Sequence, residues 1–532
     1  MPTGPPPQRF VISRLLPLAV LTSAFVLLCP LGAVAVPSPL GVADLRADLR
    51  RLLADPTLAH TRSGVVVRSR TEGDVLYEHA PRTALLPAST TKLLTSAAAM
   101  DVLGADYRFT TSVSAGTVTA DGVVPGDLYL TGTGDPTLRA SAYAELAEDV
   151  AASGVSKVAG AVVADDTWFD GQRLGHRWQA EDQQYYYAAQ ISALTVAANP
   201  DYDTGVVGVS VTPGGAKGEP LGVRLWPRTD YVTVRADTAV TGGPGTQSTL
   251  DIARRLGGNT VTVSGQLPTG GAPVERLRTV HEPAGYAADV FAAALQRAGV
   301  EVGGDPVRGT APPGTVELAR RASMPLGELL VPMMKLSNNG HAEILTKAIG
   351  REVSGVGSWT TGLPEIATAL RRIGASTDGL RLRDGSGLTR ANRVSAASVA
   401  DLLLAVRNEP WFATWRRALP VAGAADRMVG GTLRSRMRAT PAQGNVVAKT
   451  GTLTGVSALS GYVEAANGEE LVFAIINNGY TGAAPRPVQD AIAVRLARFT
   501  REHTTGAIAQ PLRAEPATTA VRGWECSWAK TC

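Results

Sequence analysis

Strand-like segments lie near both ends of the chain, and this arrangement constrains the fold more than any other feature of the sequence. Apolar runs at residues 65–69 and 75–78 have the composition of β-strands and are joined by a turn that contains Gly and Asp. Close to the C-terminus, three more strand patterns lie at residues 445–454, 456–463 and 470–477. Helix patterns separate the two groups, so we predict one antiparallel sheet to which both chain ends contribute, packed against helices.

The long middle of the chain must then be an insertion into this domain. From about residue 106 to 280, short β-like runs alternate with Gly-Asp, Gly-Gly and Pro-Gly turns, which indicates one or two β-rich units. Helix patterns begin near Ser89 and recur at residues 284–298, 326–336, 342–351, 363–373, 396–406 and 487–500. We therefore divide the chain into a leader at 1–35, two parts of a main domain at 36–108 and 313–506, an inserted β-rich region of two nested domains at 109–312, and a tail at 507–532.

The leader has the pattern of a secretory signal peptide. Arg9 and Arg14 precede an uncharged apolar run at residues 15–35, which ends in Ala33-Val34-Ala35, a small-residue cleavage pattern. The run is also long enough to span a bilayer, so an uncleaved membrane anchor is the alternative. We expect an exported protein that works in the cell envelope or outside the cell.

Charge and metal-binding residues exclude several classes of function. The chain has 51 basic and 47 acidic side chains, and its net charge of +4 is too small to indicate nucleic-acid binding. The six histidines are scattered and no C-x-x-C or H-E-x-x-H spacing occurs, so we expect neither a metal nor a cofactor. Cys526 and Cys532 lie in the tail, and whether they pair in an oxidising compartment stays open.

The first candidate for chemistry is Ser89, at the start of a predicted helix, with Lys92 three residues later. Residues at i and i+3 lie on one face of a helix, so the lysine can take the proton of the serine hydroxyl. Backbone amides near the helix N-terminus can hold an oxyanion. The motif by itself is weak, because a second copy occurs at residues 527–530, where no helix supports it.

Two further segments place polar groups at the edges of predicted elements. Ser337 and Asn339 directly precede a helix, a position that an ordinary N-terminal cap also explains. Lys449, Thr450 and Thr452 lie in an apolar strand, where an ammonium and two hydroxyls can bind a carboxylate. The chain has only seven lysines, and these candidates use two of them.

In this order, the three segments resemble the S-x-x-K, S-D-N and K-T-G motifs of serine penicillin-binding proteins and β-lactamases, although the second reads Ser-Asn-Asn in this chain. Residues 384–390, D-G-S-G-L-T-R, are similar to a segment of the class C low-molecular-mass penicillin-binding proteins, which are DD-carboxypeptidases and endopeptidases. Residues 165–169 and 185–194 are similar to that group as well. The resemblance extends over roughly residues 40–505.

Spacing distinguishes the subfamilies. From Ser89 to Ser337 is 248 residues, far more than in a class A β-lactamase, and the surplus matches the two inserted domains of the class C group. The resemblance therefore implies an α+β fold with a penicillin-binding-protein/β-lactamase-like transpeptidase domain and inserted β-rich domains.

The resemblance also implies a mechanism and a substrate. Ser89 attacks the carbonyl between the last two residues of a peptidoglycan stem peptide that ends in D-Ala-D-Ala, Lys92 is the general base, and Ser337 passes a proton to the leaving amine. The backbone amides of Ser89 and Thr452 hold the oxyanion. Implied binding residues are Lys449, Thr450 and Thr452 for the terminal carboxylate, Asn339 for a peptide amide, and Asp182 and Arg390 beside the side chain of a diamino acid. A β-lactam would acylate the same serine and inhibit the enzyme, and cross-linked peptides would make it an endopeptidase.

Three other readings remain. A secreted β-lactamase or esterase would use the same three motifs with fast deacylation. A non-catalytic wall-binding protein would have lost a catalytic residue, yet all the motif residues are present. A Ser-His-Asp hydrolase would have a G-x-S-x-G elbow, which does not occur. The oligomeric state stays open.

Overall fold

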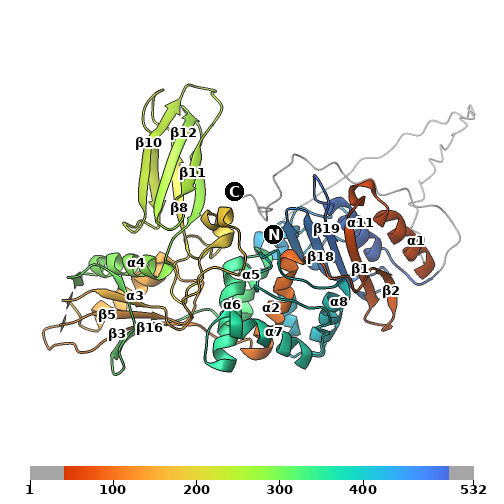
Figure 1. Cartoon of the computed structure of the whole chain (residues 1–532), viewed down its shortest axis with the longest axis horizontal. Coiled ribbons are helices and arrows are strands. Elements are labelled where there is room, and N and C mark those ends of the chain that lie inside the picture. Colours follow the sequence, from red (N-terminus) through yellow and green to blue (C-terminus); the bar gives the residue numbers. More distant parts are fainter. Residues whose placement is uncertain (1–40, 503–532) are drawn as a thin grey trace, which may run out of the picture. The chain divides into compact units, whose positions relative to one another are not determined.

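The structure is a computed structural model that describes residues 41–502 (Figure 1). The predicted leader, and the predicted tail with Cys526 and Cys532, lie outside the described residues. Within residues 41–502, no helix is long and apolar enough to cross a membrane.

Both ends of the described chain meet in one five-stranded sheet (Figure 1). Its strands are β1 (Arg62–Ser69), β2 (Val75–His79), β17 (Val447–Leu453), β18 (Val456–Glu464) and β19 (Glu470–Asn478). Their order is β17-β18-β19-β1-β2, and all neighbours are antiparallel. The first strand pairs along its whole length with the last, from Arg62 opposite Asn478 to Ser69 opposite Leu471. The predicted sheet from both chain ends is therefore confirmed.

Helices cover both faces of this sheet. Alternating side chains of β1 point to opposite faces, so Val65 and Val67 join the core beneath α1 (Val42–Leu53) and α11 (Arg486–Ala497). Val66 points the other way, into the core shared with α8 (Ala396–Ala405). Burial on both faces explains why these strands are continuous apolar runs.

The second face of the sheet is covered by a helical cluster built around α2 (Thr91–Val102). Its neighbours are α5 (Leu326–Lys335), α6 (Asn339–Ser354), α7 (Trp359–Arg372), α8 and α9 (Phe412–Arg417), and the short α10 (Arg427–Gly430) lies against α5. Ten of the twelve α2 residues are buried, and its Ala-rich sequence lets the surrounding helices approach closely.

Residues 110–322, which extend past the predicted boundary of the insertion at 312, contain a mixed sheet, a parallel sheet and two helices. A five-stranded sheet runs β15-β7-β5-β3-β16, and a three-stranded one runs β14-β6-β4. Their bounds are β3 (Thr110–Ala115), β4 (Val123–Val124), β5 (Leu128–Gly132), β6 (Lys157–Val158), β7 (Val162–Asp165), β14 (Glu301–Val302), β15 (Val307–Arg308) and β16 (Val316–Ala322). Helices α3 (Ala140–Ala152) and α4 (Pro283–Arg297) pack together beside these sheets, and α3 had no counterpart among the predicted helices.

A smaller unit is nested in the chain between β7 and α4. It consists of two three-stranded sheets, β13-β8-β9 and β10-β12-β11, which we call the small sheet unit. Its strands are β8 (Val206–Thr212), β9 (Gly222–Trp226), β10 (Thr233–Gly242), β11 (Asp251–Arg254), β12 (Thr260–Pro268) and β13 (Val274–Thr279). Its apolar side chains share one hydrophobic core with α3 and α4.

Candidate active site

Ser89 lies in a tight turn directly before helix α2. The turn is the short 3-10 helix η2 (Ala88–Thr90), and Ala88 has a φ of 48°, which an alanine seldom adopts. Side chains of the next two residues hold the turn: the Thr90 hydroxyl donates to Pro87 O (2.7 Å) and the Thr91 hydroxyl to Ala88 O (2.8 Å). The Ser89 side chain is thereby fixed at the entrance of the helix.

Lys92 faces Ser89 from one turn further along. Its side chain is fully buried, and Nζ donates to Ser89 Oγ (2.7 Å), to Asn339 Oδ1 (2.6 Å) and to Ser386 O (2.9 Å). The predicted i, i+3 contact therefore exists, inside the protein rather than on a solvated helix face. A buried amine on the serine oxygen is the geometry that a serine needs in order to lose its proton.

Ser337 and Lys449 form a second pair across the site. Lys449 is fully buried, and its Nζ donates to Ser337 Oγ (2.8 Å). Ser337 connects α5 to α6 with a φ of 60°, a left-handed conformation. The helix cap is its neighbour Asn338, whose Oδ1 accepts from the His341 amide (3.2 Å). Ser337 is consequently available to the lysine instead of capping the helix.

Asn339 connects the helical cluster to the inserted region. Its Oδ1 accepts from Lys92, and its Nδ2 donates to the Tyr187 carbonyl (2.8 Å) in the short helix η4 (Tyr186–Ala188). The backbone of Tyr187 is therefore held against the lysine that touches the serine.

Strand β17 lies with its open edge against the Ser89 turn. It is the edge strand of its sheet, and a Cβ added at Gly451 would lie 2.7 Å from Pro87 O and 3.0 Å from Ser89 N. Only glycine permits this approach. The Thr450 hydroxyl donates to Thr432 Oγ1 (2.8 Å), a residue that the sequence did not single out, and Thr452 lines the cleft beside Ser89.

A narrow cleft opens above Ser89. It is lined by Ser89, Tyr187, Asn339, Gly387, Leu388, Thr452 and Leu453. Residues from η2, from the inserted region, from α6, from segment 384–390 and from β17 thus meet at one place. The three sequence motifs converge there although they are far apart along the chain.

Asp182 and Arg390 lie at the margin of this cleft. Asp182 is buried and accepts a hydrogen bond from the Tyr187 hydroxyl (3.0 Å). Burial raises the pKa of the Asp182 carboxyl, while the Tyr187 bond and the Arg390 charge act against that rise. Arg390 is exposed and donates to Thr454 O (2.6 Å), directly after the cleft residue Leu453.

Two buried carboxylates lie behind the site: Glu343, which the sequence analysis missed, and Asp384, which it noted only as the first residue of segment 384–390. Glu343 accepts from the amides of Gly385 (2.9 Å) and Ser386 (2.8 Å) and from Trp359 Nε1 (2.7 Å). Its pKa is raised, first by burial and then by the nearby carboxylate of Asp384. Glu343 therefore holds the loop whose Ser386 carbonyl accepts from Lys92. The available signal was a lone glutamate four residues after Asn339, at a position that shares a helix face with it.

Asp384 holds the same loop from its other end. It accepts from the amides of Gly387 (2.9 Å) and Thr389 (2.6 Å) and from Trp178 Nε1 (3.0 Å). Burial raises its pKa. The D-G-S-G-L-T-R segment is thus built around its own aspartate, which folds residues 384–389 into a fixed loop.

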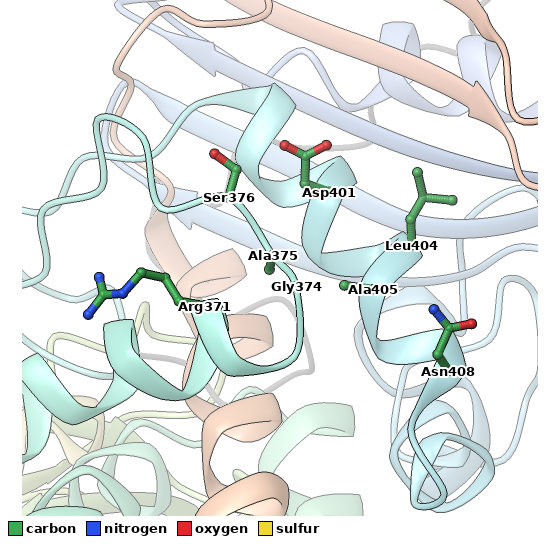
Figure 2. Close-up of a pocket in the computed structure, with 8 residues that line it drawn as sticks. All are labelled: Arg371, Gly374, Ala375, Ser376, Asp401, Leu404, Ala405 and Asn408. Atoms are coloured by element: carbon green, nitrogen blue, oxygen red, sulfur yellow. The ribbon is translucent and has the colours of Figure 1, made fainter.

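A different hollow lies between the end of α7 and α8. Its volume is about 570 Å³, and its lining includes Arg371, Ser376 and Asp401 (Figure 2). Asp401 in this hollow is paired with Arg68 (2.5 Å) of β1. None of the predicted site residues lines it. Within residues 41–502, no group of three or more His, Cys, Asp and Glu side chains is arranged to hold a metal ion.

Comparison with known proteins identifies the family. Residues 45–499 match the D-Ala-D-Ala carboxypeptidase 3 (S13) family. The chain is 49% identical over 506 residues to a D-alanyl-D-alanine carboxypeptidase of Actinomadura sp. (strain R39), covering 94% of this chain and 92% of that one. It is 30% identical to carboxypeptidase DacB of Mycolicibacterium smegmatis, over 85% and 83% of the two chains.

A solved structure has the same fold. Penicillin-binding protein 4 (dacB) of Haemophilus influenzae superposes with a TM-score of 0.72 at 25% identity, over 85% of this chain and 99% of that one. The predicted penicillin-binding-protein fold is therefore confirmed. The chain belongs to the D-Ala-D-Ala carboxypeptidase 3 (S13) family, and it is a serine peptidase that acts on D-Ala-D-Ala peptides.

Proposed function

We propose that Ser89 is the nucleophile, Lys92 its general base, and Ser337 the group that passes the proton to the leaving amine. The observation that supports this most strongly is the 2.7 Å bond from the buried Lys92 amine to Ser89 Oγ at the floor of the cleft. The 2.8 Å bond between Lys449 and Ser337 supplies a second polar pair, from the two segments that also contribute Thr452 and Asn339 to the cleft.

Acylation requires the neutral form of Lys92, whose two N–H groups donate to Asn339 Oδ1 and Ser386 O and whose lone pair faces Ser89 Oγ. The amine then takes the Ser89 proton while Oγ attacks the carbonyl of the penultimate D-Ala. The negative charge that develops on the carbonyl oxygen is stabilised by the amides of Ser89 and Thr452. When the intermediate collapses, the C–N bond breaks and the departing D-Ala amine receives a proton through Ser337. Water then hydrolyses the ester and frees Ser89. The close packing of Gly451 against the Ser89 amide supports this placement of the oxyanion.

Substrate binding uses the two ends of the cleft. Lys449, Thr450 and Thr452 bind the terminal carboxylate through charge and hydroxyl groups. Asn339 binds a peptide amide. Asp182 and Arg390 bind the amine and the carboxylate of a diamino-acid side chain, and the shared margin on which they lie supports that pairing of charges.

The same site would cleave peptide cross-links and react with β-lactams. In a cross-link the scissile bond joins D-Ala to the side-chain amine of another peptide, so the acyl half of the reaction is identical. A β-lactam presents a strained amide to Ser89, and its leaving nitrogen stays tethered, which slows deacylation. We further propose that the protein is exported and acts in the cell envelope, because the first 35 residues have a signal-peptide pattern.

The test is intact-protein and peptide mass spectrometry after brief incubation with benzylpenicillin. We expect a stable penicilloyl adduct on the Ser89 peptide in the wild type and no adduct in Ser89→Ala. Ser354→Ala, at the exposed end of α6, is the matched control and should keep the adduct. Release of D-Ala from a stem-peptide mimic then measures turnover.

Other outcomes would decide between the alternatives. Penicillin that is consumed without an adduct would favour a β-lactamase. Intact penicillin with no adduct would favour a wall-binding protein and refute the proposed roles. An adduct that persists in Ser89→Ala would assign the nucleophile to another residue.

A further inference from the structure

The cleft residue Tyr187 and its hydrogen-bond partner Asp182 lie on two very short helices. They are η3 (Ala180–Gln184) and η4, and 3-10 turns of this length do not fix side-chain directions by themselves. Asp182 belongs to η3, so the position of its carboxylate relative to the cleft depends on how this segment is held. Whatever holds the segment therefore sets where the carboxylate lies.

The small sheet unit holds it at the carbonyl of Gln183, the residue next to Asp182. Arg254 at the end of β11 donates from Nη2 to Gln183 O (2.9 Å), and the Thr279 hydroxyl at the end of β13 donates to the same oxygen (2.5 Å). Arg254 Nε in turn donates to Thr279 Oγ1 (3.0 Å). Two strands that lie some 70 to 100 residues further along the chain thus converge on one backbone oxygen.

Arg254 is buried without a counter-ion. It is 6% exposed, and its remaining bonds go from Nη1 to the carbonyls of Arg255 (3.0 Å) and Gly258 (2.7 Å). Among residues 41–502 no carboxylate offsets its burial, which lowers the pKa of the guanidinium to about 10. Burying a guanidinium among neutral oxygens costs free energy that a neutral donor would avoid. Buried charges are normally paired with an opposite charge, and exceptions to that rule are typical of functional positions.

A second arginine supports the aromatic part of the wall. The Arg278 guanidinium of β13 lies 5.3 Å from the centroid of the Tyr185 ring and is fixed by bonds from Nε (2.8 Å) and Nη2 (2.5 Å) to Ile252 O. The Tyr185 ring stacks on Tyr187, with centroids 5.7 Å apart and an angle of 16° between the planes. Tyr187 then donates to Asp182.

We propose that the small sheet unit is a specificity element, in which Arg254 is a positioning residue that fixes Asp182 for recognition of a free amine on the substrate side chain. The inference rests on the proposed role of Asp182. It assigns a task to an insertion that contributes none of the motif residues. Loss of the clamp lets Gln183 and Asp182 move and weakens binding of the amine, while Ser89 and Lys92, which the clamp does not touch, stay in place.

The test compares two peptides and one β-lactam with the full-length enzyme. The peptides end in Lys-D-Ala-D-Ala and differ in the lysine ε-amine, which is free in one and acetylated in the other. We expect the wild type to prefer the free amine in kcat/KM. In Arg254→Met that preference should fall about tenfold, while turnover of the acetylated peptide and the rate of acylation by benzylpenicillin stay within about twofold of the wild type.

Two further variants make the result decisive. Arg235→Met removes an exposed arginine of β10 in the same unit and should leave the preference unchanged. Thr279→Val removes the second donor to Gln183 with almost no change of shape, so it tests the clamp even if Arg254→Met fails to fold. Thr279→Val should also reduce the preference for the peptide with the free amine.

The outcomes separate the inference from the function on which it rests. A preference that survives in both Arg254→Met and Thr279→Val would overturn the inference alone. So would an equal loss of peptide turnover and benzylpenicillin acylation, because that would be damage to the whole site. A wild type that does not prefer the free amine, with Asp182→Asn unchanged from it, would overturn the role of Asp182 and the inference with it.

Discussion

Ser337 has a left-handed backbone conformation, which costs a serine free energy. The same residue contacts the buried Lys449. A non-glycine residue in the left-handed region is disfavoured by roughly 1 kcal/mol or more, so such residues persist where the surrounding structure enforces them. Here the end of α5 and the Asn338 cap of α6 enforce it. The strained serine is thereby directed at Lys449 Nζ.

Ser337→Ala should lower kcat for D-Ala release by about 10²-fold, because a general acid contributes roughly that much. Ser395→Ala is the matched control, since it removes the hydroxyl that caps α8 by accepting from Ser398 N (3.0 Å). The control should cost about 1 kcal/mol of stability and leave kcat unchanged. Steady-state assays and urea denaturation of both variants measure the two effects, and unchanged turnover in Ser337→Ala would remove Ser337 from the proton path.

His341 makes stability depend on pH. It is fully buried beside the site and donates from Nε2 to Tyr202 O (2.9 Å). Burial lowers its pKa from 6.5 to about 4. The unfolded chain therefore binds this proton at a higher pH than the folded one does, so stability is lost as pH falls from about 6.5 to 4. The loss is on the order of 3 kcal/mol for this group.

His341→Gln keeps a donor near Tyr202 but does not titrate. The free energy of unfolding, measured by urea denaturation from pH 7 to pH 4, should fall less steeply in this variant than in the wild type. The difference between the two curves isolates His341 from the other groups that titrate in that range. Parallel curves would mean that the imidazole is not desolvated in the folded protein.

At the scale of elements, one helix carries much of the site. Asn339, Glu343 and Lys347 are spaced by four residues and therefore share a face of α6. Along this face they contact, in turn, Lys92, the loop at 384–390, and the inserted region. The sequence pattern predicted a helix over 342–351, whereas α6 begins at Asn339, so its first turn belongs to the site.

Glu343→Gln should impair both the loop and the catalysis. A carboxylate accepts all three donors that surround Glu343, but an amide turns its own NH₂ toward at least one of them. We expect a loss of about 3 kcal/mol in unfolding free energy and slower acylation by benzylpenicillin, since the Ser386 carbonyl that accepts from Lys92 would shift.

The matched control for that variant is Glu352→Gln, which changes an exposed glutamate of the same helix. Its stability should stay within about 0.5 kcal/mol of the wild type. Urea denaturation and the rate of penicilloyl formation test both variants. Wild-type acylation by Glu343→Gln would show that the loop does not need this carboxylate.

At the scale of the whole molecule, a buried lysine ties the inserted region to the helical cluster. Lys347 Nζ donates to Asp170 Oδ1 and to Gln172 O, both at 2.5 Å, and lies 4.1 Å from the centroid of a Trp359 ring. Its side chain is fully buried, whereas that of Asp170 is 31% exposed. The contact therefore joins the two parts of the chain through a largely desolvated charge.

Lys347→Met should lower the free energy of unfolding by about 1–3 kcal/mol, less than for a fully buried pair because water reaches Asp170. A double-mutant cycle with Asp170→Asn should give a stabilising coupling energy between the two side chains. Lys157→Met is the control, because its partner Glu301 and Lys157 itself are both solvent-exposed, and it should change stability by less than about 1 kcal/mol. A coupling energy near zero in the Lys347 cycle would contradict the proposed tie.

The parts of the fold that the sequence predicted are those with a local pattern. The runs that became β1, β17, β18 and β19 could be identified because burial on both faces requires continuous apolar residues. Helix α3 was missed although its alanines favour a helix and its buried residues recur at helical spacing. The β-like runs and turns on both sides of it led to a β-rich interpretation of the whole stretch. The domain boundaries stay a prediction.

The sequence by itself determined the three motifs and the strand runs near both chain ends, since a nucleophile, its lysine and a strand are local features of a few residues. That these runs share one sheet was inferred from where they lie along the chain, and the pairing of β1 with β19 confirms it. Only the tertiary structure decided that Glu343 and Asp384 hold the loop behind Lys92, and that Arg254 and Thr279 meet at the Gln183 carbonyl. These contacts join residues that are distant along the chain and depend on burial, which no local pattern encodes. A charged side chain in a sequence looks the same whether water or a protein interior surrounds it, and the packing of the folded chain makes that choice.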